Sequence, residues 1–300
     1  MSWVTWKQHR LEGAWALSIG TVLAAAIAYV AYQLHLAACP DVVNGYCFTG
    51  DLGGQIAQQL ANFNLYTYGL AVLPALAGAF IGCPMVAREV ENGTHRLAWT
   101  QGVTRLRWLV TKIVLVFVPV MAIAAVAGAL EVVLINQLGS NPNRWNWFDQ
   151  QAPVTVAATL FALSLGLFVG AVMGRSIPAM AVTLVAFVIV RIGLAELGRP
   201  HYLAPLAYTT HDMSNFNSPP QVYPGAWWVD YASFYDSAGH MVSNAGSANG
   251  AYATNVTYAI QHFQPADRFW TFQGIESGIL VGLSAILIGF AIYWVTRRVS

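Results

Sequence analysis

Four ionisable side chains stand inside strongly apolar segments of this 300-residue sequence: Glu131, Arg191, Glu196 and Glu276. A charge within a membrane is costly unless it is paired or wetted. These residues therefore indicate either a polar outward vestibule that touches a substrate or interhelical pairing that holds a helix bundle together, and one Arg among three acids favours pairing. No His-Glu-x-x-His motif or hydrolase motif is present, so no catalytic set or metal site is predicted.

A polar stretch lies between two apolar segments, from Cys83 to Lys112. Five of the fourteen Lys and Arg residues fall here, and by the positive-inside rule they mark a cytoplasmic loop. Gly93-Thr94 offers a flexible break and an N-cap hydroxyl, and Gly102 offers a left-handed C-cap, which predicts a short helix between two longer ones. Such a helix is either a docking element for a soluble partner or an ordinary basic loop held by lipid head groups.

The order of residues in this stretch is characteristic. It reads Arg88-Glu89-x-Glu91-x-Gly93-Thr94, then Ala98-Trp99-Thr100-Gln101, then Arg105-x-Arg107-Trp108 and Lys112. It resembles the loop after the second helix in type-two ABC exporter permeases, closest to the bacterial, actinobacterial-type branch. In that family the loop forms a coupling helix that sits in a groove of the ATP-hydrolysing subunit. We call residues 83–107 the coupling loop. The resemblance assigns contact with the ATPase to Glu89, Glu91, Gly93, Thr94, Arg96, Trp99 and Gln101.

Composition places the whole chain in a membrane. Charged residues are 9% of the sequence, against roughly 25% in soluble domains. Six segments are long enough to cross a hydrocarbon core, which needs about 20 helical residues. They are Ala14–Leu36, Leu65–Val86, Trp108–Ile135, Val154–Met173, Ile177–Leu197 and Gly274–Val295. The expected fold is all-α: one transmembrane permease domain over residues 1–300 with six spans.

Orientation follows from the cations. Ten of the fourteen fall on one side if the N-terminus is cytoplasmic. Both termini are therefore expected in the cytoplasm, and the resemblance implies that the membrane is a bacterial plasma membrane. Residues 1–13 combine Trp and basic residues, which indicates an interfacial helix or an ordinary flank of the first span.

Cys39 and Cys47 then lie outside, where two thiols so close in sequence are expected to form a disulfide, the alternative being two free thiols. Cys83 is expected to stay reduced. Gly174-Arg175-Ser176 is too short for a domain, so the fourth and fifth spans should form a tight hairpin.

Residues 198–272 form the longest polar segment, on the outer side by the same orientation. Its aromatic content predicts a small folded cap before the last helix rather than a disordered linker. Within it, Tyr252, Val256, Ile260 and Phe263 recur at helical spacing, which predicts a helix.

No phosphate loop of the G-x-x-x-x-G-K-[ST] type is present. No cofactor is therefore expected in this chain, and ATP and Mg²⁺ would bind to a partner. The resemblance implies two ATPase subunits, a second permease subunit (a homodimer), membrane lipid, and a small-molecule or lipid-like substrate. A net charge of +1 argues against nucleic acid. The main rival function is a non-transporting membrane anchor or sensor that recruits a cytoplasmic ATPase; a membrane enzyme using Glu131 or Glu276 is a third.

Overall fold

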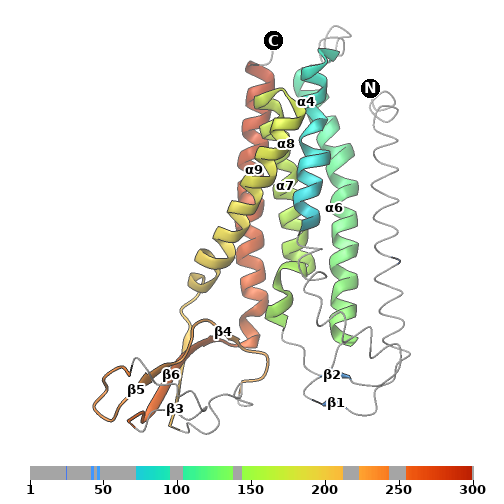
Figure 1. Ribbon diagram of the computed structural model, residues 1–300. Coiled ribbons are helices and arrows are strands. Elements are labelled where there is room, and N and C mark those ends of the chain that lie inside the picture. Colours follow the sequence, from blue (N-terminus) through green and yellow to red (C-terminus); the bar gives the residue numbers. More distant parts are fainter. Residues whose placement is uncertain are drawn as a thin grey trace.

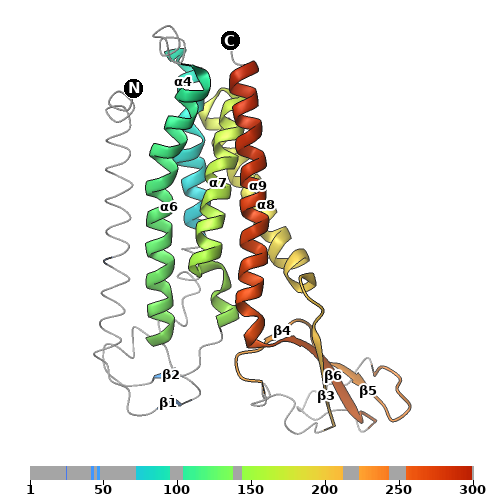
Figure 2. The ribbon, with the colours of Figure 1, turned by 180° about the vertical axis from the view of Figure 1, so that it is seen from behind.

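Long helices run side by side and carry a small sheet at one end (Figures 1 and 2). The computed structural model describes residues 72–94, 104–137, 144–211, 223–242 and 255–298, together with 42–43, 46–47 and Ala25. Five helical segments in this part are long and apolar enough to span a membrane. They are Val72–Glu91, Arg105–Leu130, Arg144–Met173, Ser176–His201 and Ala266–Arg297.

These five segments correspond to the last five predicted spans. The predicted first span, residues 14–36, and the predicted interfacial helix, residues 1–13, lie outside the described residues. The protein is thus a mostly helical, multi-pass membrane protein.

Several spans join more than one type of helix. In chain order the elements are η1 (Gly78–Gly82), α4 (Pro84–Glu91), α6 (Arg105–Gln137), η2 (Arg144–Gln150), α7 (Ala152–Met173), α8 (Ser176–Ile192), η3 (Gly193–Gly198), η4 (Arg199–His201), η5 (Ala266–Arg268) and α9 (Phe269–Arg297). The elements η1 and η3 are π-helical, so both the first described span and the α8 segment change their helical pitch along their length. Pro84 begins α4 directly after η1, at the point where the helical hydrogen-bonding pattern changes.

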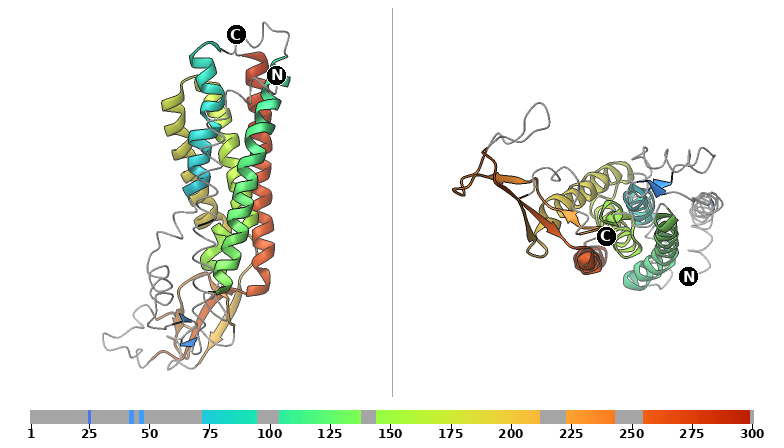
Figure 3. Two further views of the ribbon diagram at one scale, coloured as in Figure 1. Left: turned by 90° about the vertical axis from the view of Figure 1, so that its right-hand side faces the viewer. Right: turned by 90° about the horizontal axis from the view of Figure 1, so that it is seen from below.

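Helix α7 lies in the middle of the bundle, with η1, α4, α6, α8 and α9 packed around it (Figure 3). Its contact with η1 is very close because glycines stand on both sides. A Cβ atom added to Gly166 would lie 2.1 Å from the carbonyl oxygen of Gly78, and one added to Gly78 would lie 2.4 Å from that of Ala162. Backbone therefore packs on backbone here, as small residues allow in membrane bundles.

Helices α7 and α8 form the tight hairpin that the sequence predicted. Gly174 ends α7 with φ 59°, a left-handed conformation that suits glycine, and α8 begins at Ser176. The turn lies at the same end of the bundle as the end of α4 and the start of α6. We call this end of the bundle the loop end, and the opposite end the sheet end.

Between the α8 segment and α9 the chain forms a four-stranded antiparallel sheet. Its strands are β3 (Leu206–Thr210), β4 (Trp227–Trp228), β5 (Ser233–Tyr235) and β6 (Tyr258–Gln264), and the other three all pair with β6. The prediction of a helix through Ile260 and Phe263 is wrong. Pairing with three strands along one seven-residue segment overrides a local spacing that also fits a helix.

Aromatic side chains join the sheet to the bundle. Trp227 of β4 packs on Trp145 of η2, with ring centroids 5.3 Å apart, and Trp145 contacts Phe269 and Phe272 of α9. Phe148 completes this buried cluster. The sheet extends sideways from the ends of the α8 segment and α9 (Figures 1 and 3).

A second, two-stranded pair consists of β1 (Val42–Val43) and β2 (Tyr46–Cys47). Val42 is opposite Cys47 in this antiparallel pair. Cys39 and the side chain of Cys47 lie outside the described residues, so their disulfide stays a prediction. Cys83 is buried and free.

Candidate functional site

The coupling loop begins as helix α4, and a buried lysine of α6 holds that helix in place. Lys112 has only 1% of its side chain exposed. Its ammonium group forms an ion pair with Glu89, donates a hydrogen bond to the carbonyl oxygen of Met85 (3.1 Å) and lies 4.5 Å from the centre of the Trp108 ring. A buried charge is tolerated only when it is paired and hydrogen-bonded. Here both of these conditions are met, so α4 and α6 are joined at the loop end.

Glu91, the last residue of α4, makes a second connection. One oxygen of its carboxylate accepts hydrogen bonds from the backbone N–H of Ser176 (3.0 Å) and from its hydroxyl (2.9 Å). Ser176 is the first residue of α8, and the first N–H groups of a helix have no partner within it. Glu91 thus caps α8 from a different helix, with its negative charge at the positive end of the α8 dipole.

Just after α4 the chain turns sharply. Gly93 has φ 69°, a conformation that favours glycine, and the Thr94 hydroxyl donates to the carbonyl oxygen of Glu89 at 3.4 Å. The hydroxyl therefore contacts the helix before it. Three predicted ATPase-contact residues, Arg96, Trp99 and Gln101, lie outside the described residues.

Helix α6 is connected to the end of α9 at its first residue, Arg105. Arg105 donates from Nη1 to the carbonyl oxygen of Thr296 (3.3 Å), in the last turn of that helix. The two sides of the coupling loop are therefore attached to three helices: α4 is held on α6 and α8, and the start of α6 is held on α9.

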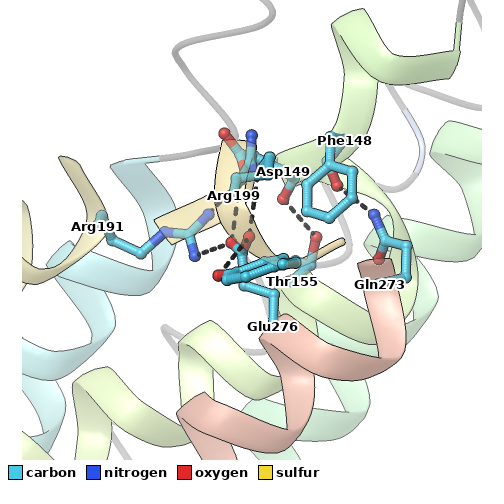
Figure 4. Close-up of polar contacts among 8 residues, drawn as sticks. Phe148, Asp149, Thr155, Arg191, Arg199, Gln273 and Glu276 are labelled. Carbon is cyan, nitrogen blue, oxygen red and sulfur yellow. Dashed lines mark hydrogen bonds and ion pairs between the residues drawn. The ribbon is translucent and has the colours of Figure 1, made fainter. Parts of the chain in front are cut away.

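A second polar cluster lies at the sheet end (Figure 4). Arg191 of α8 forms ion pairs with Glu276 of α9 (2.7 Å) and Asp149 of η2 (2.6 Å). Arg199 of η4 pairs with the same two carboxylates, at 2.6 Å to Asp149 and 3.0 Å to Glu276. We call Asp149, Arg191, Arg199 and Glu276 the charged network.

The network is neutral and largely shielded from solvent. Glu276 is fully buried, and the two Arg side chains are 15% and 11% exposed, whereas Asp149 is 34% exposed. Arg199 also stacks on the Phe148 ring, 4.0 Å from its centre. The network joins η2, the α8 segment and α9 just where the sheet begins.

Neighbouring polar groups hold the network in position. Tyr202 donates a weak hydrogen bond to Glu276 (3.4 Å), and burial, with the negative charge of Glu276 second, raises the pKa of this phenol to about 12. The hydroxyl therefore stays protonated and can donate. Thr155 donates to the backbone carbonyl of Asp149 (3.1 Å), and Gln273 donates to that of Phe148 (2.7 Å), so η2 is fixed on α7 and α9.

The structure brings two of the four predicted intramembrane charges together. Arg191 and Glu276 form an ion pair. Glu196 is exposed on η3 and does not belong to the charged network, and the side chain of Glu131 lies outside the described residues.

Sequence reasoning missed Asp149 and Arg199, because both lie just beyond the predicted ends of apolar spans. The signal that could have found Arg199 is its place two turns after Arg191 in the same helical segment.

The arrangement contains no recognisable catalytic set among the described residues. Each charge of the network is matched, and no group of three or more His, Cys, Asp and Glu residues in the described part could hold a metal ion. What these contacts can do is fix helices to one another at both ends of the bundle. In the described part of the chain, five apolar helices joined by these charged contacts define a multi-pass membrane protein whose polar groups connect helices.

Comparison with protein families identifies the class more closely. The model of the family described as "ABC-2 membrane transporter related" matches residues 13–199, more than half of the chain. The chain belongs to this family, whose members are non-catalytic membrane components of transporters, and this indicates a permease component of an ABC transporter. The match includes the coupling loop and ends before the sheet and α9. No curated protein and no solved structure matches the chain.

Proposed function

We propose that this chain is the permease subunit of an ATP-driven exporter in the bacterial plasma membrane, with both termini in the cytoplasm. Two copies would form the translocation path for a small-molecule or lipid-like substrate. Each copy would bind one separate ATPase subunit, which supplies the ATP and Mg²⁺ sites.

One observation carries this proposal. The coupling loop lies within the family match, and its two ends, α4 and the start of α6, are attached to the bundle by charged contacts. A loop attached in this way can pass the movement of a bound partner to α6, α8 and α9 together, whereas a freely hinged loop would absorb it. Transport needs such a mechanical connection because the ATPase and the translocation path are in different chains.

The test is purification of the tagged, full-length chain from its native membranes, followed by identification of co-purified proteins by mass spectrometry. An ATPase subunit with a phosphate loop is expected. Arg96→Glu and Trp99→Ala should each lower its yield roughly tenfold, because central charged and aromatic contacts dominate interfaces. Arg298→Glu is the matched control, because Arg298 is exposed at the same end but outside the coupling loop. Absence of an ATPase from the wild-type preparation would refute the proposal.

A further inference from the structure

Glu89 and Glu91, the two acids among the predicted ATPase-contact residues, are both engaged inside the permease. Glu89 pairs with Lys112, which is almost completely buried, and Glu91 accepts two hydrogen bonds from Ser176. Neither contact involves another protein. A carboxylate that leaves its partner to bind an ATPase would abandon either a buried ammonium group or the first N–H of α8.

Other contacts support the attachment of α4 to the start of α8. The Cys83 thiol, immediately before α4, lies 3.7 Å from the carbonyl oxygen of Ser176. Cys83 and Ala87 form a buried cluster with Ala179 of α8, and Val90 packs against the Gly174 turn. The α7–α8 turn is therefore held by three kinds of contact along α4: a thiol, an apolar surface and a carboxylate.

We propose that Glu89 and Glu91 form an internal clasp that positions the coupling loop on α6 and α8, and that they are not the surface to which the ATPase binds. This rests on the proposed function, and it makes Lys112 and Ser176 positioning residues as well.

The clasp also connects α4 to the far end of the α8 segment. The α8 segment is helical from Ser176 to His201 and carries Arg191 and Arg199 of the charged network near its far end. At about 1.5 Å per residue, its 26 residues extend roughly 39 Å. A displacement of α4 at the loop end would thus be passed through α8 to the charged network and to the first strand of the sheet.

The test combines hydrogen–deuterium exchange of the full chain in lipid nanodiscs with co-purification of the ATPase. Glu89→Gln should raise exchange at the end of α4 and the start of α6 at least about tenfold, because the buried ammonium group of Lys112 loses the negative charge of Glu89. Glu91→Ala should raise exchange at the start of α8 about three- to tenfold, and Glu91→Gln should raise it less, because the amide oxygen still accepts from Ser176. Arg298→Gln removes a charge at the same end and should change neither region.

A double variant separates the clasp from a docking surface. Lys112→Met combined with Glu89→Gln removes both charges, so the exchange of the loop and the yield of ATPase should return to nearly wild-type values. Wild-type exchange with the ATPase still lost would show that Glu89 contacts the ATPase itself and would overturn the clasp. If the wild-type chain retains no ATPase, the proposed function fails, and exchange alone then decides whether the clasp exists.

Discussion

Glu276 is the residue whose loss should destabilise the bundle most clearly. Its carboxylate is fully buried and accepts three hydrogen bonds from Arg191 and Arg199, at 2.7, 3.0 and 3.0 Å. Replacing Glu276 by Ala leaves two nearly buried guanidinium groups with Asp149 as the remaining acid in the charged network. Breaking a buried ion pair by removing one partner costs about 3–5 kcal/mol, and because Asp149 remains, we expect a loss of about 3 kcal/mol.

The measurement is equilibrium unfolding of the purified chain in mixed micelles of a mild detergent and sodium dodecyl sulfate. Glu276→Gln should lose less than Glu276→Ala, because the amide oxygen keeps one acceptor for the guanidinium groups. Glu196→Gln is the matched control, since Glu196 is exposed on η3, and its effect should stay within about 0.5 kcal/mol. Equal stabilities of Glu276→Ala and Glu196→Gln would refute the assignment of the charged network as a structural connection.

Three further outcomes follow from the packing and the topology. Gly166→Ala should strongly reduce the yield of folded protein, because the new Cβ would lie 2.1 Å from a backbone oxygen. Gly278→Ala is the control and should be tolerated, because a Cβ there has nothing within 4 Å; fluorescence-detected size exclusion compares the two variants. Tyr231→Cys, between β4 and β5 at a position that is 96% exposed, should react with an impermeant maleimide in intact cells, and labelling only after lysis would reverse the proposed orientation. Mass spectrometry of unreduced protein should find Cys39 joined to Cys47, and free thiols at both positions would contradict that prediction.

Apolar length was enough to predict the described spans, because a membrane helix must satisfy its backbone internally and cover about 30 Å of hydrocarbon. The turn at Gly174 could also be predicted from the sequence, since a single residue in the left-handed conformation permits so short a helical hairpin. Hydrogen-bond partners that are distant in the sequence could not be predicted from it. Glu91 and Ser176 are 85 positions apart, and nothing local indicates that an acid of one helix caps another.

The sheet was missed for a related reason. The residues of β6 fit both a helix and a strand locally, and only their pairing with β3, β4 and β5 decides between the two. In the charged network, Arg191 and Glu276 could be recognised because they interrupt apolar runs. Asp149 and Arg199 lie among other polar residues in the sequence, where a charged residue gives no signal of a buried ion pair.

The central claim is that ATP use by a partner changes the conformation of this permease, and one measurement tests it most directly. The purified complex with its ATPase carries the substitution Glu196→Cys, at an exposed position on η3, and is reconstituted in nanodiscs. It is labelled with a maleimide with and without ATP and vanadate. Labelling of the wild-type chain gives the background from its natural cysteines. Transport predicts a several-fold change in the labelling rate when the nucleotide is trapped, because opposite ends of α8 move together. Identical rates in a complex that binds and hydrolyses ATP would contradict the exporter account and would identify the chain as a membrane anchor for the ATPase.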